Sequence, residues 1–256
     1  MPTAEPRRSL PMISCILATR NRHRFLPQAL RCFARQTYRN SELIVVDDSD
    51  RPAARLCRDL PRVRYIRLTR PTPTGTKLNI GIEAARGEII QKLDDDDFYR
   101  ADFLAASAAH MPRRGLRSTI VTRCCFLVLS KDRPALRHSG HGWNPGGTFC
   151  FHRSLVRRQP FRDVPRSVDS WLIHDLQPRI IRVCEVEQYI VLRHGRNTWN
   201  RMATGQTADE YLAGLATYPK PLHRLVPAAD FRFYCAFFRW RNASISSSEI
   251  RHTPRP

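Results

Sequence analysis

Four consecutive aspartates, Asp94 to Asp97, end an apolar segment and precede two aromatic residues in GEIIQKLDDDDFY. The segment from Glu88 to Leu93 predicts a buried strand. Carboxylates crowded at a strand's end repel one another, and they stay ionised only where a cation or water compensates them. Mg²⁺ and Mn²⁺ prefer oxygen ligands, and Mg²⁺ is commonly held by one or two carboxylates together with substrate phosphates. The run therefore indicates either a metal site that receives a phosphorylated ligand or a solvated acidic turn.

A second acidic strand end lies upstream, in ELIVVDDSD. Leu43 to Val46 form an apolar, β-branched segment of the kind found in parallel sheets with both faces covered, and it stops at Asp47 and Asp48. The strand predicted before it, MISCILATRNR, ends in the polar residues Thr19, Arg20 and Asn21. Ligands bind outside the carboxyl ends of the strands in open α/β sheets. We therefore expect the two acidic ends to face one crevice, which favours the metal site over the solvated turn.

Strand-like and helix-like patterns alternate from residue 12 to about residue 110. This alternation predicts an α/β fold with a mostly parallel sheet and helices on both faces. Further along, TIVTRCCFLVLS predicts one strand, GTFCFHRSLVRR a strand entering a helix, and RVCEVEQYIVLRHG two short strands. We expect a disordered leader over residues 1–11, a main domain over residues 12–205, and a helical and aromatic extension over residues 206–256 that frays at its end.

The chain has 256 residues and a formal net charge of +20, which predicts a polyanionic neighbour: nucleic acid, an anionic membrane surface or a phosphate-rich ligand. Arginine is spread along the whole chain, however, without the single basic arm of a dedicated DNA reader, and genomic base composition explains the enrichment equally well. The sequence contains no stretch of about 20 apolar residues, so we expect no transmembrane helix. The polar N-terminus lacks the apolar core of a secretory signal, so we expect a cytoplasmic protein.

The chain contains 8 cysteines but no C-x-x-C pair, which argues against a zinc ribbon or a thioredoxin-like motif. Several of them lie inside apolar segments, where cysteine behaves as a small hydrophobic residue. We therefore expect all of them to be reduced structural thiols.

Together these segments resemble the family 2 glycosyltransferases, which have the GT-A fold. The resemblance covers residues 12 to about 200 and is carried by four pieces: ISCILATRNRHRFLPQALRCFARQTYRNSELIVVDDS, GTKLNIGIEAARGEIIQKLDDDD, GGTFCFHRSLVRRQPFRDVPRSVDSWL and VLRHGRNTW. It implies an enzyme that moves a sugar from a nucleotide-diphosphate sugar, with a UDP-sugar favoured, to an acceptor hydroxyl, with inversion. It also implies a bound Mn²⁺ or Mg²⁺ ion.

The resemblance assigns the nucleotide to the first two strand ends and the segment before the acidic run. It places Thr19, Arg20 and Asp48 around the base, with Asn21 and Asp47 close by. Arg20 stands where many relatives have an aromatic residue, and a guanidinium can also stack on a base. The alternative role for Asp47 and Asp48 is to cap the following turn. In GTKLNIGIEAARG, Lys77 and Asn79 match the element that contacts the diphosphate, and a solvated lysine at a helix start is the alternative for Lys77.

LDDDDFY corresponds to the family's D-x-D metal motif. Side chains two apart on an extended segment point the same way, so Asp94 and Asp96 form the pair, with Asp96 the direct metal ligand. Asp94 and Asp95 are expected to hold the ribose and support the ligands, and Asp97 to cap a helix starting near Tyr99. His194 in VLRHGRNTWN resembles a late histidine that ligates the metal or contacts the diphosphate in some members, and a structural role is equally open.

The resemblance places the catalytic base in PFRDVPRSVDSWL, where Val168 replaces the family's glutamate and Asp169 aligns with the aspartate. Asp175 is the competing candidate. The base accepts the proton of the attacking acceptor hydroxyl. Trp143, Gly146 and Gly147 are expected to line the sugar or acceptor pocket, although Trp143 could equally belong to the core.

Three alternatives remain beside the transferase. The first is a basic nucleic-acid-binding protein, which the acidic strand ends disfavour because carboxylates repel phosphates unless a metal intervenes. The second is a degenerate, inactive transferase-fold protein, which the loss of the glutamate at Val168 would explain. The third is a nucleotidyltransferase, which would usually carry glycine in the segment that here reads ATRNRHR. The expected acceptor is a glycan or a lipid-linked glycan, and the basic surface leaves open a peripheral contact with the inner face of an anionic membrane.

Overall fold

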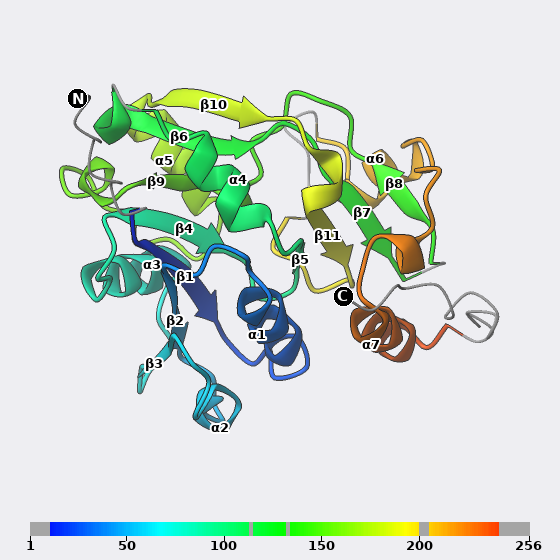
Figure 1. The fold of residues 1–256 in the computed structure, drawn as a ribbon, viewed down its shortest axis with the longest axis horizontal. Coiled ribbons are helices and arrows are strands. Elements are labelled where there is room, and N and C mark those ends of the chain that lie inside the picture. The colour runs from blue at the N-terminus through cyan, green and yellow to red at the C-terminus, as the bar shows by residue number, and fades with distance from the viewer. Residues whose placement is uncertain (1–10, 113–114, 132–133, 200–204, 241–256) are drawn as a thin grey trace, which may run out of the picture.

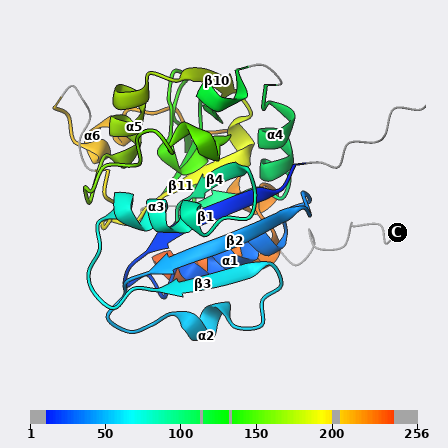
Figure 2. The same ribbon diagram turned by 90° about the vertical axis from the view of Figure 1, so that its left-hand side faces the viewer.

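The computed structural model describes residues 11–112, 115–131, 134–199 and 205–240. Within these residues, seven strands form a central sheet in the order β10-β6-β9-β4-β1-β2-β3 (Figure 1), of which Figure 2 shows β4, β1, β2 and β3 following one another. The strands are β1 (Ile13–Thr19), β2 (Ser41–Asp47), β3 (Val63–Arg67), β4 (Ile89–Leu93), β6 (Thr119–Arg123), β9 (Cys150–His152) and β10 (Arg179–Val183). Strand β9 runs antiparallel to both of its neighbours, and the other pairings are parallel. The predicted α/β fold with a mostly parallel sheet is confirmed.

Helices cover both faces of this sheet, with α1 and α3 on opposite sides of β1 (Figure 1). Along β1, Ile13, Cys15 and Leu17 belong to the core on the α1 side, whereas Ile16 belongs to the core on the α3 side. Side chains of an extended strand alternate between the two faces of a sheet. Because both faces are covered here, every residue of β2 is also buried. The helices are α1 (Leu26–Ala34), α2 (Ala54–Cys57), α3 (Thr74–Glu83), α4 (Phe103–Ala109), α5 (Val168–Leu176), α6 (Ala208–Ala213) and α7 (Ala228–Phe238).

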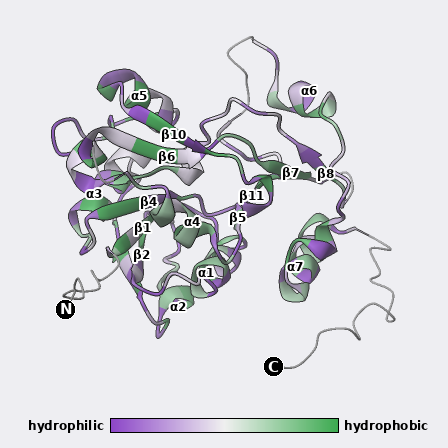
Figure 3. Ribbon diagram, turned by 45° about the horizontal axis from the view of Figure 1, so that its top comes forward, coloured by the Kyte–Doolittle hydropathy of each residue, from purple (hydrophilic) through white to green (hydrophobic). Residues whose placement is uncertain are grey.

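A second, smaller sheet lies beside the first and has the order β5-β11-β7-β8 (Figure 1). Its strands are β5 (Phe98–Tyr99), β7 (Leu127–Ser130), β8 (Leu136–His138) and β11 (Tyr189–Arg193). The prediction of one strand over TIVTRCCFLVLS is wrong, because the chain leaves the central sheet after β6 and enters the second sheet at β7. Of the two strands predicted over RVCEVEQYIVLRHG, the second is present as β11, whereas the first coincides only with the last two residues of β10, which begins upstream at Arg179. Figure 3 shows the apolar colouring of β4 in the large sheet and of β7 in the small one.

The helix predicted after GTFCFH is also wrong. Strand β9 is followed by a single 3₁₀ turn over Arg153–Leu155, in which the His152 side chain accepts a hydrogen bond from the Ser154 N–H. That side-chain contact closes a local turn and replaces the start of a regular helix. The other 3₁₀ turns of the described chain are Leu116–Ser118, Gly146–Thr148, Val186–Gln188 and Leu222–Arg224.

The C-terminal helix α7 packs against α1. The buried carboxylate of Asp230 pairs with Arg35 and lies 3.5 Å from Nε of Arg31, and Gln28 donates a 3.3 Å hydrogen bond to the hydroxyl of Tyr234. The ring of Phe237 lies 4.7 Å from that of Phe25, between centroids. The aromatic segment therefore closes the core. The predicted leader and frayed tail lie at residues 1–10 and 241–256, outside the described residues, and no described helix is long and apolar enough to cross a bilayer.

The expectation that all cysteines are reduced is wrong for one pair, because Cys124 and Cys184 form a disulfide. Strands β6 and β10 are parallel neighbours with Arg123 opposite Val183, so the residues that follow them lie side by side, 5.2 Å apart between Cα atoms. The six other cysteines are free thiols, and most are buried as expected.

Close packing of α3 on the sheet gives a first prediction. A Cβ atom added at Gly81 would lie 2.5 Å from Cγ2 of Ile16, inside the core. Gly81→Ala should therefore destabilise the protein by about 1–3 kcal/mol through overpacking, measured by urea unfolding. Gly214→Ala is the matched control, because its Cβ would meet nothing closer than 3.6 Å and its φ is −79°. Equal stability of the two variants would contradict this account of the α3 contact.

Candidate active site

The strand order places the predicted site at the junction of β1 and β4. Strands β1, β2 and β3 follow one another in one direction, whereas β4 adds to the other side of β1, which makes this junction a topological switch point. Leu17 lies opposite Leu93 and Thr19 opposite Asp47, so the ends of β1, β2 and β4 reach the same edge. There Thr19 donates a 2.6 Å hydrogen bond from Oγ1 to Oδ2 of Asp95. This register brings the acidic ends of β2 and β4 to one edge of the sheet, as we expected from the sequence.

The four aspartates alternate in exposure. Asp94 and Asp96 are partly exposed, whereas Asp95 and Asp97 are buried. Burial, together with the charge of Asp96, raises the pKa of Asp95 to about 7. Asp97 accepts hydrogen bonds from the hydroxyl of Tyr189 and, at 3.0 Å, from the backbone N–H of Leu192, so it joins the acidic turn to β11. The expected helix-capping role of Asp97 is wrong, because α4 begins only at Phe103.

Asp96 faces a histidine from the far end of the chain. Nε2 of His194 lies 2.9 Å from Oδ2 of Asp96, and the His194 side chain is only 2% exposed. Nη1 of Arg22 lies 3.2 Å from the same carboxylate oxygen and 2.9 Å from the same ring nitrogen. A carboxylate and an imidazole thus converge on one point, and the guanidinium of Arg22 supplies a positive charge there. Asn197 fixes the backbone at this histidine, because its Oδ1 accepts a 3.0 Å hydrogen bond from the backbone N–H of His194.

Asp94 is joined to Asp169 through a buried lysine. Nζ of Lys92 lies 2.7 Å from Oδ1 of Asp94 and 3.4 Å from Oδ2 of Asp169. Burial alone would lower the pKa of Lys92, but the two carboxylates outweigh it and raise that pKa. For Asp169, burial and the nearby Asp94 raise the pKa, while Lys92 opposes the shift. Oδ1 of Asp169 is buried and has no hydrogen-bond partner among the described residues. A carboxylate with a raised pKa and an uncommitted oxygen suits proton transfer.

Two glycines let the backbone approach both carboxylates. A Cβ atom on Gly146 would collide with the carboxylate of Asp169, and one on Gly147 would lie 2.5 Å from Oδ2 of Asp94. The structure therefore places the predicted pocket residues Gly146 and Gly147 directly beside the site. Trp143 instead packs edge-to-face against Phe126, with 5.5 Å between ring centroids, which matches its alternative role in the core.

Asp175, the competing base candidate, is committed to another partner. Arg162 donates two hydrogen bonds to its carboxylate, at 2.7 and 2.6 Å. Hydrogen bonds from Arg162 and His174 lower the pKa of Asp175 to about 2. A carboxylate held in a bidentate pair with so low a pKa is a poor proton acceptor, so the geometry favours Asp169.

At the end of β2 the two aspartates differ. Lys77 donates a 2.7 Å hydrogen bond to Oδ1 of Asp48 and a 3.1 Å one to the backbone oxygen of Thr19, so it ties β2 to β1 rather than standing in solvent. Asp48 also accepts the Thr72 N–H at 2.7 Å, and Arg20 approaches it to 3.8 Å. The exposed Asn21 side chain exchanges hydrogen bonds with Asp50.

Asp47 and Asn79 have structural partners at every polar side-chain atom. Asp47 is fully buried and accepts hydrogen bonds from Ser49, from the Ala53 N–H and from the hydroxyl of Tyr65. This is the turn-capping alternative. Asn79 exchanges two hydrogen bonds with the backbone of Phe161, at 2.8 and 3.0 Å, and so fixes the segment that leads to Asp169. Both residues position others at the site.

Arg22 and Lys92 were absent from the residues selected from the sequence. Lys92 could have been found, because a lysine inside a strand buried on both faces requires carboxylate partners. Arg22 carried no such signal, since it lies among several arginines at a polar strand end. A pocket between α3 and residues 153–160, lined by Asn79, Ile82, Glu83, Arg153, Val156, Arg157 and Pro160, lies apart from the acidic run.

The network around Asp47 gives a second prediction. Burial raises the pKa of Asp47, but hydrogen bonds from Ser49, Ala53 and Tyr65 outweigh it and lower that pKa below the ordinary 3.8. A lowered pKa stabilises the fold above the unfolded value and loses that effect as the pH falls. Asp47→Asn should therefore destabilise the protein by about 1–3 kcal/mol at neutral pH. The difference from wild type should shrink as unfolding is repeated toward and below pH 3.8.

Asp59→Asn is the control for this measurement, because Asp59 is exposed and asparagine tolerates its φ of 60°. It should change stability by no more than about 0.5 kcal/mol. A deficit in Asp47→Asn that is independent of pH would contradict the charged role of Asp47.

Comparison with known proteins places these features in a family. The model of Glycosyl transferase family 2 matches residues 14–164. The putative colanic acid biosynthesis glycosyl transferase WcaA of Escherichia coli is 32% identical over 105 residues, which are 39% of this chain and 38% of the relative. An uncharacterized glycosyltransferase of Haemophilus influenzae is 32% identical over 102 residues, or 38% and 40% of the two chains. The matches therefore span about two-fifths of these relatives' length.

Solved structures share the fold at low sequence identity. Staphylococcus aureus TarS, residues 1–349 in complex with UDP-GlcNAc, has a TM-score of 0.58 at 16% identity, covering 73% of this chain and 60% of that one. The mannosyltransferase PcManGT of Pyrobaculum calidifontis, in complex with GDP-Man and Mn²⁺, has a TM-score of 0.57 at 19% identity, covering 75% and 59%. The family match spans more than half of the chain and the fold agrees with it, so the protein belongs to glycosyl transferase family 2.

Proposed function

We propose that this protein is a metal-dependent glycosyltransferase that moves a sugar from a nucleotide-diphosphate sugar to an acceptor hydroxyl with inversion. The observation that carries the proposal is the convergence of Asp96 and His194, from segments 98 residues apart, on one point at the switch point of the sheet. Family membership supports the transferase class, and the titles of the TarS and PcManGT structures support a nucleotide-sugar donor.

Asp96 and His194 are suitable ligands for Mn²⁺ or Mg²⁺. One offers a carboxylate oxygen and the other a ring nitrogen, a combination that suits Mn²⁺ better than Mg²⁺. Nη1 of Arg22 lies 3.2 Å from the carboxylate oxygen and 2.9 Å from the ring nitrogen, so a positive charge already stands beside both atoms. Asp94, whose side chain is 37% exposed, is available to a metal-bound ligand or to the ribose. When bound, the ion would offset the negative charge of the departing diphosphate.

The proposed nucleotide site lies along the ends of β1 and β2. Asp48 would accept hydrogen bonds from the base or ribose, and Arg20, whose side chain is 39% exposed, would stack on the base. The hydrogen bond from Thr19 to Asp95 would join the end of β1 to the acidic run beneath the nucleotide. Lys77 positions Asp48 rather than contacting the diphosphate, because its ammonium is already paired.

Asp169 is the proposed general base. Its carboxylate would accept the proton of the acceptor hydroxyl as that oxygen forms a bond to the anomeric carbon, while the bond from that carbon to the diphosphate breaks. A single displacement of this kind inverts the anomeric configuration. Lys92 keeps Asp169 beside Asp94, so base and donor are held on one scaffold. Gly146 leaves room at the carboxylate of Asp169.

We favour a glycan or lipid-linked glycan as the acceptor. The relative in Campylobacter jejuni, 33% identical over 95 residues, is named as a β-1,3-glucosyltransferase acting on GalNAc(5)-diNAcBac-PP-undecaprenol. The net charge of +20 would favour such an anionic acceptor and a peripheral contact with an anionic membrane. The division into a main domain over 12–205 and an extension over 206–256 stays a prediction.

The metal ligands are tested by nucleotide binding. Calorimetric titration with UDP and GDP should show binding that requires Mn²⁺, and Asp96→Asn should weaken it by more than about 10-fold, because a metal ligand is lost. Asp59→Asn, at an exposed aspartate between α2 and β3, should bind as the wild type does. If neither nucleotide binds the wild type with Mn²⁺ present, the transferase proposal fails and a degenerate member becomes the better explanation.

The base is tested separately. Asp169→Asn should lower kcat by about 10²- to 10⁴-fold and leave nucleotide affinity unchanged, because Asp169 acts only in the chemical step. The same substitution at Asp175 tests the competing candidate and should have the smaller effect. In the wild type, the raised pKa of Asp169 should place the acid limb of kcat/KM above the ordinary value of 3.8. An acid limb at or below that value, or a larger loss at Asp175, would contradict the assignment.

A further inference from the structure

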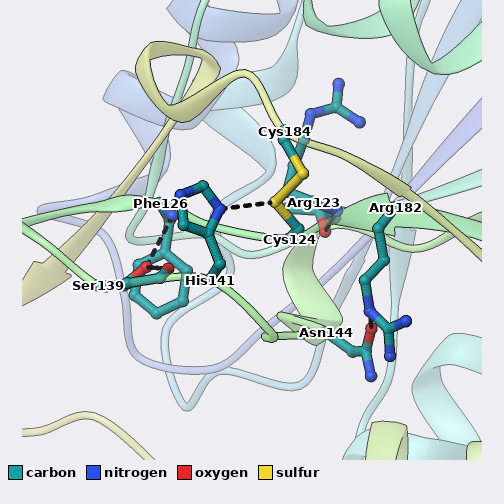
Figure 4. The surroundings of a disulfide bond; sticks show 10 residues. Arg123, Cys124, Phe126, Ser139, His141, Asn144, Arg182 and Cys184 are labelled. Carbon is teal, nitrogen blue, oxygen red and sulfur yellow. Dashed lines mark hydrogen bonds between the residues drawn. A yellow bond between two sulfur atoms is a disulfide. The ribbon is translucent and has the colours of Figure 1, made fainter.

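Two cysteines and a histidine meet near the start of the loop that leads from β8 to Gly146 and Gly147. One ligand atom each from Cys124, His141 and Cys184 lies within 4.8 Å of the others, and Figure 4 shows the three side chains facing one another. Among the described residues, this is the group of three or more potential ligands that could hold a metal ion. The proposed transfer reaction uses none of them.

The fold builds this cluster from three separate segments. Cys124 follows β6 and Cys184 follows β10, and the parallel register of these strands carries the two side chains to the same edge. His141 lies in the loop after β8, with Nδ1 3.3 Å from Sγ of Cys124. The backbone N–H of Trp143 donates a 3.0 Å hydrogen bond to the Cys124 oxygen, which holds the loop against the cysteine.

We propose that Cys124, His141 and Cys184 form a Zn²⁺ site when the cysteines are reduced, and that the disulfide is its oxidised, metal-free form. Thiolate and imidazole are the ligands that Zn²⁺ prefers, and three protein ligands leave a fourth, tetrahedral position for water. Binding releases the two thiol protons, since zinc coordinates the thiolates. His141 and Cys184 are exposed, so an ion can enter from solvent, whereas Cys124 is buried and fixes one ligand in place.

The two forms interconvert by thiol–disulfide exchange. One thiolate attacks a low-molecular-weight disulfide and forms a mixed disulfide, releasing one small thiolate. The second cysteine then attacks that mixed disulfide, which closes the Cys124–Cys184 bond, releases a second small thiolate and frees the zinc ion. The two electrons given up by the cysteines reduce the small disulfide. An excess of small thiol reverses both steps and restores the ligands.

The place of the cluster links it to the candidate active site. Nε of Arg182, on β10, donates a 3.0 Å hydrogen bond to Oδ1 of Asn144, in the same loop (Figure 4). A few residues later, Gly146 and Gly147 lie against Asp169 and Asp94. A zinc ion bound by His141 would therefore tie the start of the segment whose end shapes the site to the ends of β6 and β10, whereas the disulfide joins only β6 to β10. In the metal-free forms this loop keeps its backbone hydrogen bond from Trp143 to Cys124 but lacks the metal bond through His141.

The site is tested with Co²⁺ as a spectroscopic probe for Zn²⁺ on the reduced full-length chain. Thiolate ligation gives Co²⁺ an intense ligand-to-metal charge-transfer absorption that a carboxylate and imidazole site such as Asp96 and His194 does not produce. We expect this absorption in reduced wild type and its loss when Zn²⁺ is added in competition. Oxidised wild type, with its disulfide verified by mass spectrometry, should not show it.

Variants identify the ligands. Cys124→Ser and Cys184→Ser should abolish the charge-transfer absorption, and His141→Ala should weaken Co²⁺ binding by more than about 10-fold, because a ligand is lost. Cys125→Ala is the matched control: Cys125 adjoins Cys124 but is a buried free thiol outside the cluster, so the absorption should persist. Circular dichroism of each variant confirms folding. The proposal is overturned if reduced wild type, with its thiols counted as free, shows no such absorption, or if His141→Ala binds Co²⁺ as tightly as wild type.

Discussion

The parallel pairing of β1 with β4 is the contact on which the candidate site depends. Because β4 joins the opposite side of β1 from β2, the ends of three strands meet at one edge, and the acidic run after β4 lies next to Thr19 and near Asp48. The pairing is fixed by buried apolar residues on both faces of each strand, so a slip of one residue would turn those side chains to the wrong core. The position of each aspartate thus follows from the packing of the sheet.

Bringing so many carboxylates together requires compensating positive charge. Lys77 pairs with Asp48, Lys92 with Asp94 and Asp169, and Arg22 with Asp96. Each pair leaves its aspartate in a different state. Asp48 pairs with a lysine that also bonds the backbone of Thr19, Asp169 keeps one buried oxygen without a hydrogen-bond partner, and the arginine paired with Asp96 also contacts His194. In the proposed function, these differences assign base recognition, proton transfer and metal binding to different aspartates of one acidic edge.

The sequence predicted the features that depend on local pattern. Alternating strands and helices, the acidic strand ends and the alternation of Asp94 to Asp97 all follow from side-chain periodicity, and the structure shows them. Contacts between distant segments were harder. The split of TIVTRCCFLVLS between two sheets and the two hydrogen bonds from Arg162 to Asp175 depend on tertiary neighbours that no local pattern encodes. The Cys124–Cys184 disulfide was missed for the same reason, since it required the pairing of β6 with β10.

A crystal structure of the protein with Mn²⁺ and UDP, with anomalous scattering to locate the ion, tests the proposed metal site most directly. We expect Mn²⁺ bound to Oδ2 of Asp96 and Nε2 of His194, with the guanidinium of Arg22 displaced from its position beside these two atoms. Nucleotide bound with Arg22 still in contact with those two atoms, and no ion there, would contradict the proposed metal site.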